Sequence, residues 1–382
     1  MASSFQLDAD EQLAVDELAR FAQAEIAPSV ANHLGDIIPK DVAHGILRNL
    51  AQFGVGSGWV REEGGGLGLP FRLSGRLYEA LARSCPDVAG MCFAHEGAAM
   101  KIFGGARPAV REKLLGGLIA GELIGCSAVT EASGGSNVRA MRTRAEDAGS
   151  HYRVAGEKMW ISNATIADVT LLTAKASDGS YVMLAVDLRE TQVERREIKK
   201  LGLNGWSLGQ LNFVDTLVPK ENVIGEINGG LRETMRGFER ARCFVSTIAL
   251  GLAGAALDHS IRYAKDRQQF GKSLGELQLI QELIADMATE LDASRLLVYR
   301  ALDLLDQGVQ CNKEAAMAKV FATEAAVRIT SKAIQIHGAY GISTEFPLER
   351  LFRCARMLTI PDGTTQINQL VIGRELLGLS AF

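Results

Sequence analysis

The first third of the chain repeats apolar residues at the spacing of amphipathic helices. In "LDADEQLAVDELARFAQAEIAP", Asp8 is a candidate N-cap with Glu11 three residues later, and Pro28 is expected to end the helix. The apolar face of this helix is formed by Leu13, Leu18, Phe21 and Ile26. Similar patterns predict further helices near residues 40–53, 72–84, 88–103 and 108–120. Residues 1–121 are therefore predicted to be an α-helical domain.

Short segments in which apolar and polar residues alternate follow between residues 124 and 228. They include "HYRVAGEKMWIS", "VTLLTAKA" and "YVMLAVDL", and turn residues separate them. A period of two is typical of strands that bury one face. Residues 122–229 are predicted to form an antiparallel β domain, either a sandwich or, as we prefer, a barrel.

Helical spacing returns after residue 230 in longer segments. One stripe consists of Leu277, Ile280, Ile284, Met287, Leu291 and Val298, and the segment "NKEAAMAKVFATEAAVRITSKAIQIHG" has another before its final glycine. Four such helices would make a bundle. The predicted fold class is α+β: an N-terminal helical domain, a middle β-barrel and a C-terminal four-helix bundle over residues 230–382.

Composition narrows the function to small-molecule chemistry. The net charge is −4 with interspersed signs, which favours neither nucleic acid nor a membrane surface as a partner. The longest uncharged run, residues 243–257, is shorter than the roughly 20 residues of a membrane span, and the N-terminus has no secretory pattern. Six cysteines without a CxxC pair argue against metal or disulfide frameworks and favour a cytoplasmic location.

Two motifs lie in the predicted β domain. "AVTEASGGSN" (128–137) contains Thr130 and Ser136, whose hydroxyls accompany glycine backbone N–H groups. Alone, this cluster would be a turn. "KMWISNATIADV" (158–169) places Trp160 and Ser162 on one face of a strand, although core packing is the other interpretation of the tryptophan.

Two further motifs lie in the predicted bundle. "RYAKDRQQFGKSLGELQLIQELIADM" (262–287) contains Arg267 and Phe270, of which an isolated arginine would be a solvated helix end. "QIHGAYGISTEFPLERLFRCARMLTIPDGTTQI" (335–367) is the fourth motif. In this order the four motifs resemble those of the acyl-CoA dehydrogenase family, flavoproteins that oxidise acyl thioesters to enoyl thioesters.

The resemblance implies FAD as cofactor and assigns residues to it. Thr130, Trp160 and Ser162 match residues around the flavin ring, and Ser136 matches one that contacts both flavin and thioester. Arg267, Phe270, Gln335 and Gly338 match residues that reach a neighbouring subunit's flavin, which implies a homo-oligomer, expected to be a tetramer. Thr364 and Gln366 match residues beside the cofactor. The family's proline and aspartate are replaced by Ala132 and Asn137.

The resemblance places Asp362 at the position of the catalytic base, where most relatives have glutamate. Aspartate is shorter by about 1.5 Å. Three interpretations remain open: Asp362 is a base for a short, branched or alicyclic acyl group; it serves another reaction, as in flavoproteins resembling nitroalkane oxidase; or it only caps the helix that follows. In the last case Glu239, on the helix after the barrel, is the reserve base.

The acyl pocket is expected between the base and the fourth helical segment. Met91 and Phe93 would line it, unless they only pack in the core, and Arg242 would contact the substrate. The expected partners are an acyl-CoA and an electron acceptor such as an electron-transfer flavoprotein. The alternatives are an acyl-carrier-protein thioester, a flavin oxidase or monooxygenase on this fold, and a non-catalytic flavoprotein.

Overall fold

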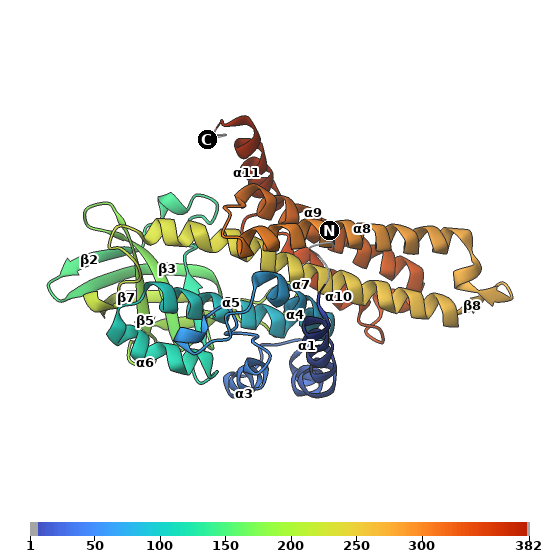
Figure 1. The fold of residues 1–382 in the computed structure, drawn as a ribbon, viewed down its shortest axis with the longest axis horizontal. Helices are drawn as coiled ribbons and strands as arrows, with labels where there is room; N and C mark the ends of the chain where they lie inside the picture. The colour runs from blue at the N-terminus through green and yellow to red at the C-terminus, as the bar shows by residue number, and fades with distance from the viewer. Residues whose placement is uncertain (1–6, 380–382) are drawn as a thin grey trace.

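The structure is a computed structural model that describes residues 7–379, so residues 1–6 and 380–382 of the two expected terminal domains lie outside it. Figure 1 shows a sheet at one end of the molecule, long helices at the other, and a group of shorter helices beneath their junction. The architecture is thus the predicted one, a helical domain, a curled sheet and a second helical domain.

The first helical domain begins at the predicted cap. Asp8 accepts a hydrogen bond from the backbone of Glu11, and the Glu11 side chain accepts one from the backbone of Asp8. The expected stop at Pro28 is wrong, because a π-helical segment leads into a short helix that contains this proline. The elements are α1 (Ala9–Phe21), α2 (Ala27–Val30), α3 (Lys40–Ala51), α4 (Phe71–Ser84), α5 (Pro86–Gly105) and α6 (Pro108–Ile119).

The middle domain is a seven-stranded sheet with the order β1-β4-β2-β3-β7-β6, in which β5 also pairs with β4. Most pairs are antiparallel as predicted, but β1 and β2 both run parallel to β4. The strands are β1 (Gly125–Ala128), β2 (Arg144–Ala148), β3 (His151–Ser162), β4 (Val169–Ala176), β5 (Tyr181–Asp187), β6 (Glu194–Glu197) and β7 (Leu208–Pro219).

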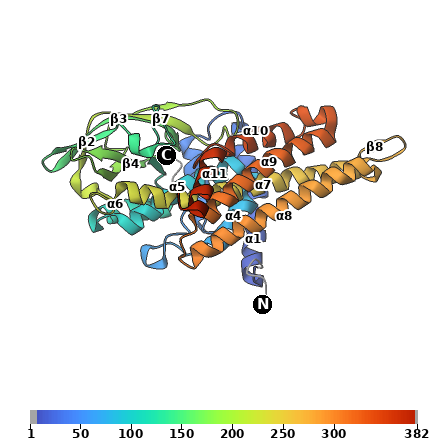
Figure 2. The ribbon, with the colours of Figure 1, turned by 90° about the horizontal axis from the view of Figure 1, so that it is seen from above.

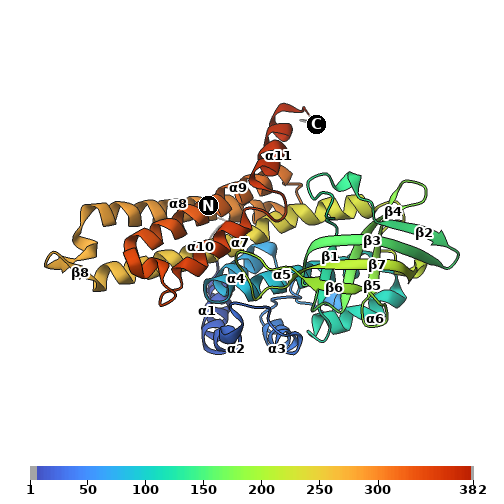
Figure 3. The same ribbon diagram turned by 180° about the vertical axis from the view of Figure 1, so that it is seen from behind.

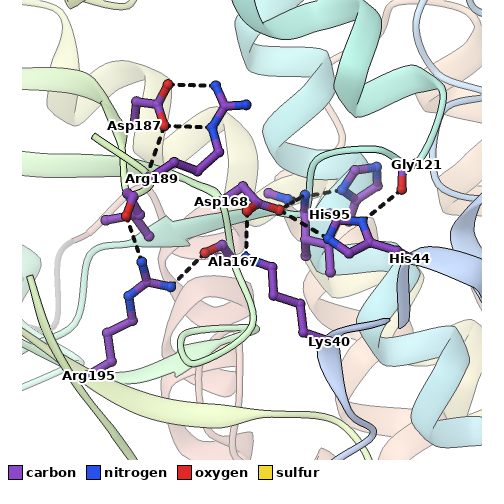
Figure 4. A network of polar contacts seen from close by, with 12 residues as sticks. Lys40, His44, His95, Gly121, Ala167, Asp168, Asp187, Arg189 and Arg195 are labelled. Carbon is purple, nitrogen blue, oxygen red and sulfur yellow. Dashed lines mark hydrogen bonds and ion pairs between the residues drawn. The ribbon is translucent and has the colours of Figure 1, made fainter. Parts of the chain in front are cut away.

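A polar network joins the first helical domain to the sheet (Figure 4). Asp168, just before β4, is buried and accepts hydrogen bonds from Lys40 Nζ at 2.5 Å and from the backbone of Ile124 at 2.9 Å. The Nε2 atom of His44 lies 3.5 Å from the same carboxylate. Because a buried carboxylate needs such partners, the network fixes α3 against β1 and β4.

The second helical domain contains the longest helices, and Figure 2 shows α7, α8 and α9 running side by side. They are α7 (Gly230–Asp266), α8 (Gln278–Asp306), α9 (Asn312–His337), α10 (Leu348–Leu358) and α11 (Thr365–Leu377), with the short hairpin β8 (Gln268–Gln269) and β9 (Lys272–Ser273) at the far tip. Figure 3 shows α11 standing away from the body. Within the described residues, α7 alone is long and apolar enough to cross a membrane, but most of that stretch is buried in the protein.

Candidate active site

Asp362 lies in the turn between α10 and α11, where three segments of the fold meet. Its backbone φ is +54°, a left-handed conformation that is unfavourable for a residue with a Cβ atom. Thr364 is the N-cap of α11, and its Oγ1 accepts a hydrogen bond from the backbone of Ile367 at 3.3 Å. The capping role that Asp362 could have filled therefore belongs to Thr364.

The charges of three cations from three helices act on the Asp362 carboxylate. Burial raises the pKa of Asp362, and the positive charges of Lys319, Arg242 and Lys101 oppose this rise in that order. Asp362 as a whole residue is half-buried, so a ligand could approach it. A strained, half-buried acid with several cations around it is the arrangement expected of a functional carboxylate rather than a structural one.

Of these three cations, Arg242 is the one with a hydrogen bond to Asp362, within the described residues. Its Nε lies 3.5 Å from the backbone oxygen of Asp362, and its Nη1 donates to Asn312 Oδ1 at 2.5 Å. Arg242 is buried, and burial lowers its pKa while Asp362 opposes that effect. The structure thus brings together Asp362 and Arg242, which were predicted to share the site.

Glu239, the predicted reserve base, contacts the start of another helix. Glu239 Oε1 accepts a hydrogen bond from the backbone N–H of Cys311 at 2.6 Å, directly before α9 begins. A carboxylate at a helix N-terminus satisfies an N–H group that the helix leaves free and interacts favourably with the helix dipole. This contact supports a capping role for Glu239.

The loop that contains Thr130 and Ser136 is anchored to β3 by a buried ion pair. Lys158 of β3 donates to the backbone oxygen of Val129 at 2.8 Å and to Glu131 Oε1 at 3.0 Å. Glu131 also accepts from the backbone of the segment that follows the loop. Thr130 is half-buried and Ser136 is exposed, so both hydroxyls are available to a ligand.

Trp160 is the most unusual side chain of the sheet. Its φ is +62° at an irregularity in the pairing of β3 with β7, and 51% of the residue is exposed. Ser162, two residues along, is half-buried, and the backbone of Met159 donates to Thr130 O at 2.9 Å. An exposed indole in a strained backbone, beside free hydroxyl groups, fits the flat ring of a flavin, which would cover it.

A second group of predicted FAD contacts lies at the opposite tip of the molecule (Figures 1 and 3). Phe270, in the β8–β9 turn, is 91% exposed with φ +53°, and the Arg267 guanidinium lies 6.0 Å from the ring centre of Tyr340. Gln335 and Gly338 are exposed nearby at the end of α9. One chain therefore does not bring these residues to Trp160.

The remaining predicted site residues differ in how deeply they are buried. Phe93 is half-buried and stacks on Phe244 of α7 with ring centres 6.2 Å apart. Met91 is fully buried in the core, and its backbone oxygen accepts from Asn163, so the structure favours packing for its side chain. Gln366 is exposed in the first turn of α11, beside the Thr364 cap.

Sequence reasoning missed two buried lysines. Lys158 occupies the inner face of β3 together with Tyr152 and Val154, and the period-two pattern already placed it there. Lys319 lies on the buried face of α9 between Ala315 and Ala322, a charged residue within an alanine stripe. In both cases the available signal was a lysine at an apolar position.

Comparison with known proteins identifies the class of enzyme. Family models of the acyl-CoA dehydrogenase N-terminal, middle and C-terminal domains match residues 8–122, 126–216 and 228–377. Among the described residues no group of three His, Cys, Asp or Glu side chains could hold a metal ion. The fold is that of the acyl-CoA dehydrogenases, a class of flavin-dependent oxidoreductases.

Individual relatives cover most of the chain. Cyclohex-1-ene-1-carbonyl-CoA dehydrogenase of Syntrophus aciditrophicus is 32% identical over 97% of this chain and 91% of its own. The caffeyl-CoA reductase-Etf complex subunit CarC of Acetobacterium woodii is 41% identical over 70% of this chain and 72% of its own. A solved glutaryl-coenzyme A dehydrogenase in complex with glutaryl-CoA superposes with a TM-score of 0.93 at 31% identity, covering 98% and 97% of the two chains.

The chain belongs to the acyl-CoA dehydrogenase family. Members of the family are FAD-binding flavoproteins, so FAD is its cofactor.

Proposed function

We propose that the protein oxidises the α,β bond of an acyl thioester, with Asp362 as the base. The observation that carries this proposal is the environment of Asp362. Its backbone is strained, the residue is half-buried, and Thr364 rather than Asp362 caps α11. The charges of three cations act on its carboxylate. Bound FAD would supply the acceptor for the hydride that leaves the β-carbon. Asp362 takes the α-proton, and its carboxylate becomes neutral as it does so.

The protein must also make the α-proton more acidic. A thioester carbonyl that accepts a hydrogen bond from the backbone N–H of Asp362 would be polarised next to the carboxylate that takes the proton. This arrangement is the one implied by the family resemblance. Arg242, whose Nε lies 3.5 Å from the backbone oxygen of Asp362, would restrain the next peptide group of the same turn.

The proposed acyl group is short, branched or alicyclic. Aspartate reaches about 1.5 Å less far than glutamate, so the α-carbon must lie closer to the turn. Phe93, stacked on Phe244, would limit the depth of the pocket. The relative from Syntrophus aciditrophicus is named for a cyclohexene-carbonyl thioester, which supports an alicyclic candidate here.

CoA is the proposed thiol carrier, and a carrier protein is the second candidate. The specific observation in favour of the second is that Ala132 and Asn137 replace the family's proline and aspartate in an exposed loop. An electron-transfer flavoprotein is the proposed acceptor of electrons, since one relative is a subunit of a complex named for such a protein. The cytoplasmic location stays a prediction.

The functional unit is proposed to be a homo-oligomer, expected to be a tetramer. Among the residues matched to one FAD site, those of β3 and those of the β8–β9 hairpin lie at opposite ends of a single chain (Figures 1 and 3). A second copy that presents Arg267 and Phe270 to the Trp160 end would complete the site. The guanidinium suits phosphate oxygens, and the exposed ring suits a flavin edge.

The test is anaerobic titration of the FAD-loaded protein with linear, branched and alicyclic acyl-CoAs while the flavin absorbance is recorded. Bleaching by one class of acyl-CoA is the expected result and defines the pocket. If no acyl-CoA bleaches the flavin, carrier-protein thioesters are titrated next. Failure of both thioester classes would overturn the proposal, whereas rapid reoxidation in air would indicate an oxidase.

A further inference from the structure

Lys319 of α9 is a fully buried cation. Within the described part of the chain, its hydrogen bonds all go to neutral groups. Its exposed fraction is 0%, and its Nζ donates to the backbone oxygens of Thr359 at 2.7 Å and Gly363 at 2.8 Å. Burying an ammonium group is costly unless hydrogen bonds and an opposite charge compensate. Two carbonyl groups supply the hydrogen bonds, so the compensating negative charge must come from nearby side chains.

The two carbonyls bracket the base. Thr359 follows the end of α10, and Gly363 precedes the N-cap of α11, so Lys319 binds the turn on both sides of Asp362. The Asn368 side chain donates to the same Gly363 oxygen at 2.7 Å. Because Asp362 has a left-handed backbone that does not persist unaided, these bonds hold the turn in the form that presents the carboxylate.

The charges of Lys319 and Asp362 depend on each other. Burial lowers the pKa of Lys319 to about 8, and Asp362 is the largest influence that opposes this. Conversely, the Lys319 charge is the largest influence that opposes the burial-induced rise in the pKa of Asp362. Each group therefore favours the ionised form of the other.

Other charged groups act on this pair or lie beside it. Lys101 of α5, Arg242 of α7 and Glu324 of α9 act on one or both of its charges. Glu239 of α7 and Arg374 of α11 act on Arg242, and Arg356 of α10 contacts Thr359. Glu324 accepts a hydrogen bond from Thr365, and Glu239 accepts one from the start of α9. Of the acidic groups, Asp362 has the largest influence on the charge of Lys319, and Glu324 adds to it.

We propose that Lys319 is the positioning residue of the base: its ammonium group fixes the turn 359–363 and supplies the charge that keeps Asp362 ionised. This inference rests on the proposed role of Asp362. In the reaction Asp362 accepts one proton and becomes neutral, while Lys319 stays protonated and keeps its two carbonyl bonds. Lys319 thus makes the base available at neutral pH without touching the substrate.

A double-mutant cycle tests the charge coupling without any substrate. The free energy of unfolding of the FAD-loaded protein is measured at pH 7 for wild type, Lys319→Met, Asp362→Asn and the double variant. In the wild-type background Asp362→Asn should destabilise, because it leaves Lys319 without its counter-charge. In the Lys319→Met background the same change should cost less or be neutral, since Asp362 no longer balances a buried ammonium group. The expected coupling is about tenfold or more in the folding equilibrium constant.

Two further variants separate charge from hydrogen bonding. Lys319→Gln keeps a donor without the charge and Lys319→Arg keeps the charge, so both are expected to fold even where Lys319→Met does not. Lys332→Met is the matched control, because Lys332 lies on the same helix but pairs with Asp286 and Glu290 at the surface. Deuterium exchange of residues 359–363 should rise in Lys319→Met and not in the control.

A pH profile provides the functional measurement. Anaerobic flavin reduction by butyryl-CoA and cyclohexanecarbonyl-CoA should require a higher pH in Lys319→Gln, because its Asp362 ionises later, with a shift of about one pH unit. Lys319→Arg should restore the wild-type profile. Additive stabilities in the cycle together with an unshifted profile would overturn this inference. If instead Asp362→Asn reduces its flavin normally, the proposed function fails, whatever the cycle shows.

Discussion

The ammonium of Lys158 lies 3.0 Å from the carboxylate of Glu131, and the two side chains are 0% and 6% exposed. The pair joins the middle of β3 to the loop that carries Thr130 and Ser136. Burial lowers the pKa of Lys158 while Glu131 opposes that change, so the two charges compensate each other. A single strand thus presents Trp160 on one side and anchors the adjoining loop on the other.

Breaking this pair should loosen the flavin loop. Lys158→Met leaves Glu131 buried without its cation, which we expect to cost about 3 kcal/mol of unfolding free energy and to weaken FAD binding. The measurements are urea unfolding and titration of the apoprotein with FAD. Lys175→Met, at an exposed position of β4, is the control and should change neither quantity. Unchanged FAD affinity in Lys158→Met would show that the loop does not depend on the pair.

The second prediction concerns the base. Asp362→Asn should keep FAD bound but slow flavin reduction by about 10²–10⁴-fold, the usual contribution of a general base. Asp362→Glu should retain part of the activity, because its carboxylate is preserved but moved by about 1.5 Å. Anaerobic stopped-flow reduction with the most active acyl-CoA measures both. An Asn variant at the wild-type rate would contradict the assignment and make Glu239→Gln the next variant.

The third prediction concerns the shared FAD site. Trp160→Ala and the double variant Arg267→Ala/Phe270→Ala should each bind FAD weakly as pure proteins, since each damages one half of every site. When the two variants are co-expressed, hybrid oligomers should recover some sites in which both halves are intact. FAD content per chain and light scattering measure the recovery. FAD binding by a monomer of wild-type protein would refute the shared site.

The three-part architecture could be predicted because long periodic patterns repeat one local rule many times. The helices of the two helical domains were predicted from this periodicity. The Asp8–Glu11 capping box was predicted from the three-residue spacing of its two acids. Pro28 was misjudged because a π-helical turn before it shifts the hydrogen-bond register, so a missing N–H is tolerated. The parallel pairs of β4 depend on where the chain returns, which alternation does not encode.

The candidate site was predictable only in part. Asp362 and Trp160 stand in motifs, Arg242 was expected beside the substrate, and the structure places Asp362 and Arg242 in contact. Lys319 belongs to no motif that we recognised, and its partners are backbone oxygens 40 and 44 residues away in the chain. A backbone carbonyl has no residue identity, so no sequence pattern identifies it as a partner. Such contacts become visible only once the chain is folded.

The last prediction uses Glu96, a buried acid of α5 outside the base turn. Its exposed fraction is 0%, and it accepts hydrogen bonds from the backbones of Gly56 and Trp59 and from the Tyr78 hydroxyl. Burial raises its pKa from 4.5 to about 7, and these hydrogen bonds only partly offset the rise. The folded protein therefore binds a proton at Glu96 in a pH range where the unfolded chain has lost it.

The sign of the resulting pH dependence follows from linkage. Between pH 4.5 and 7 folding takes up this proton, so the free energy of unfolding should fall as the pH rises through that interval, on the order of 3 kcal/mol in total. Glu96→Gln cannot titrate and should lack this fall, while Glu17→Gln, an exposed control, should keep it. Urea unfolding at several pH values measures each difference from wild type. His95, whose pKa burial lowers to about 4, is present in all three proteins, so its opposite contribution cancels in the comparison. Parallel wild-type and Glu96→Gln curves would show that Glu96 does not titrate in this range.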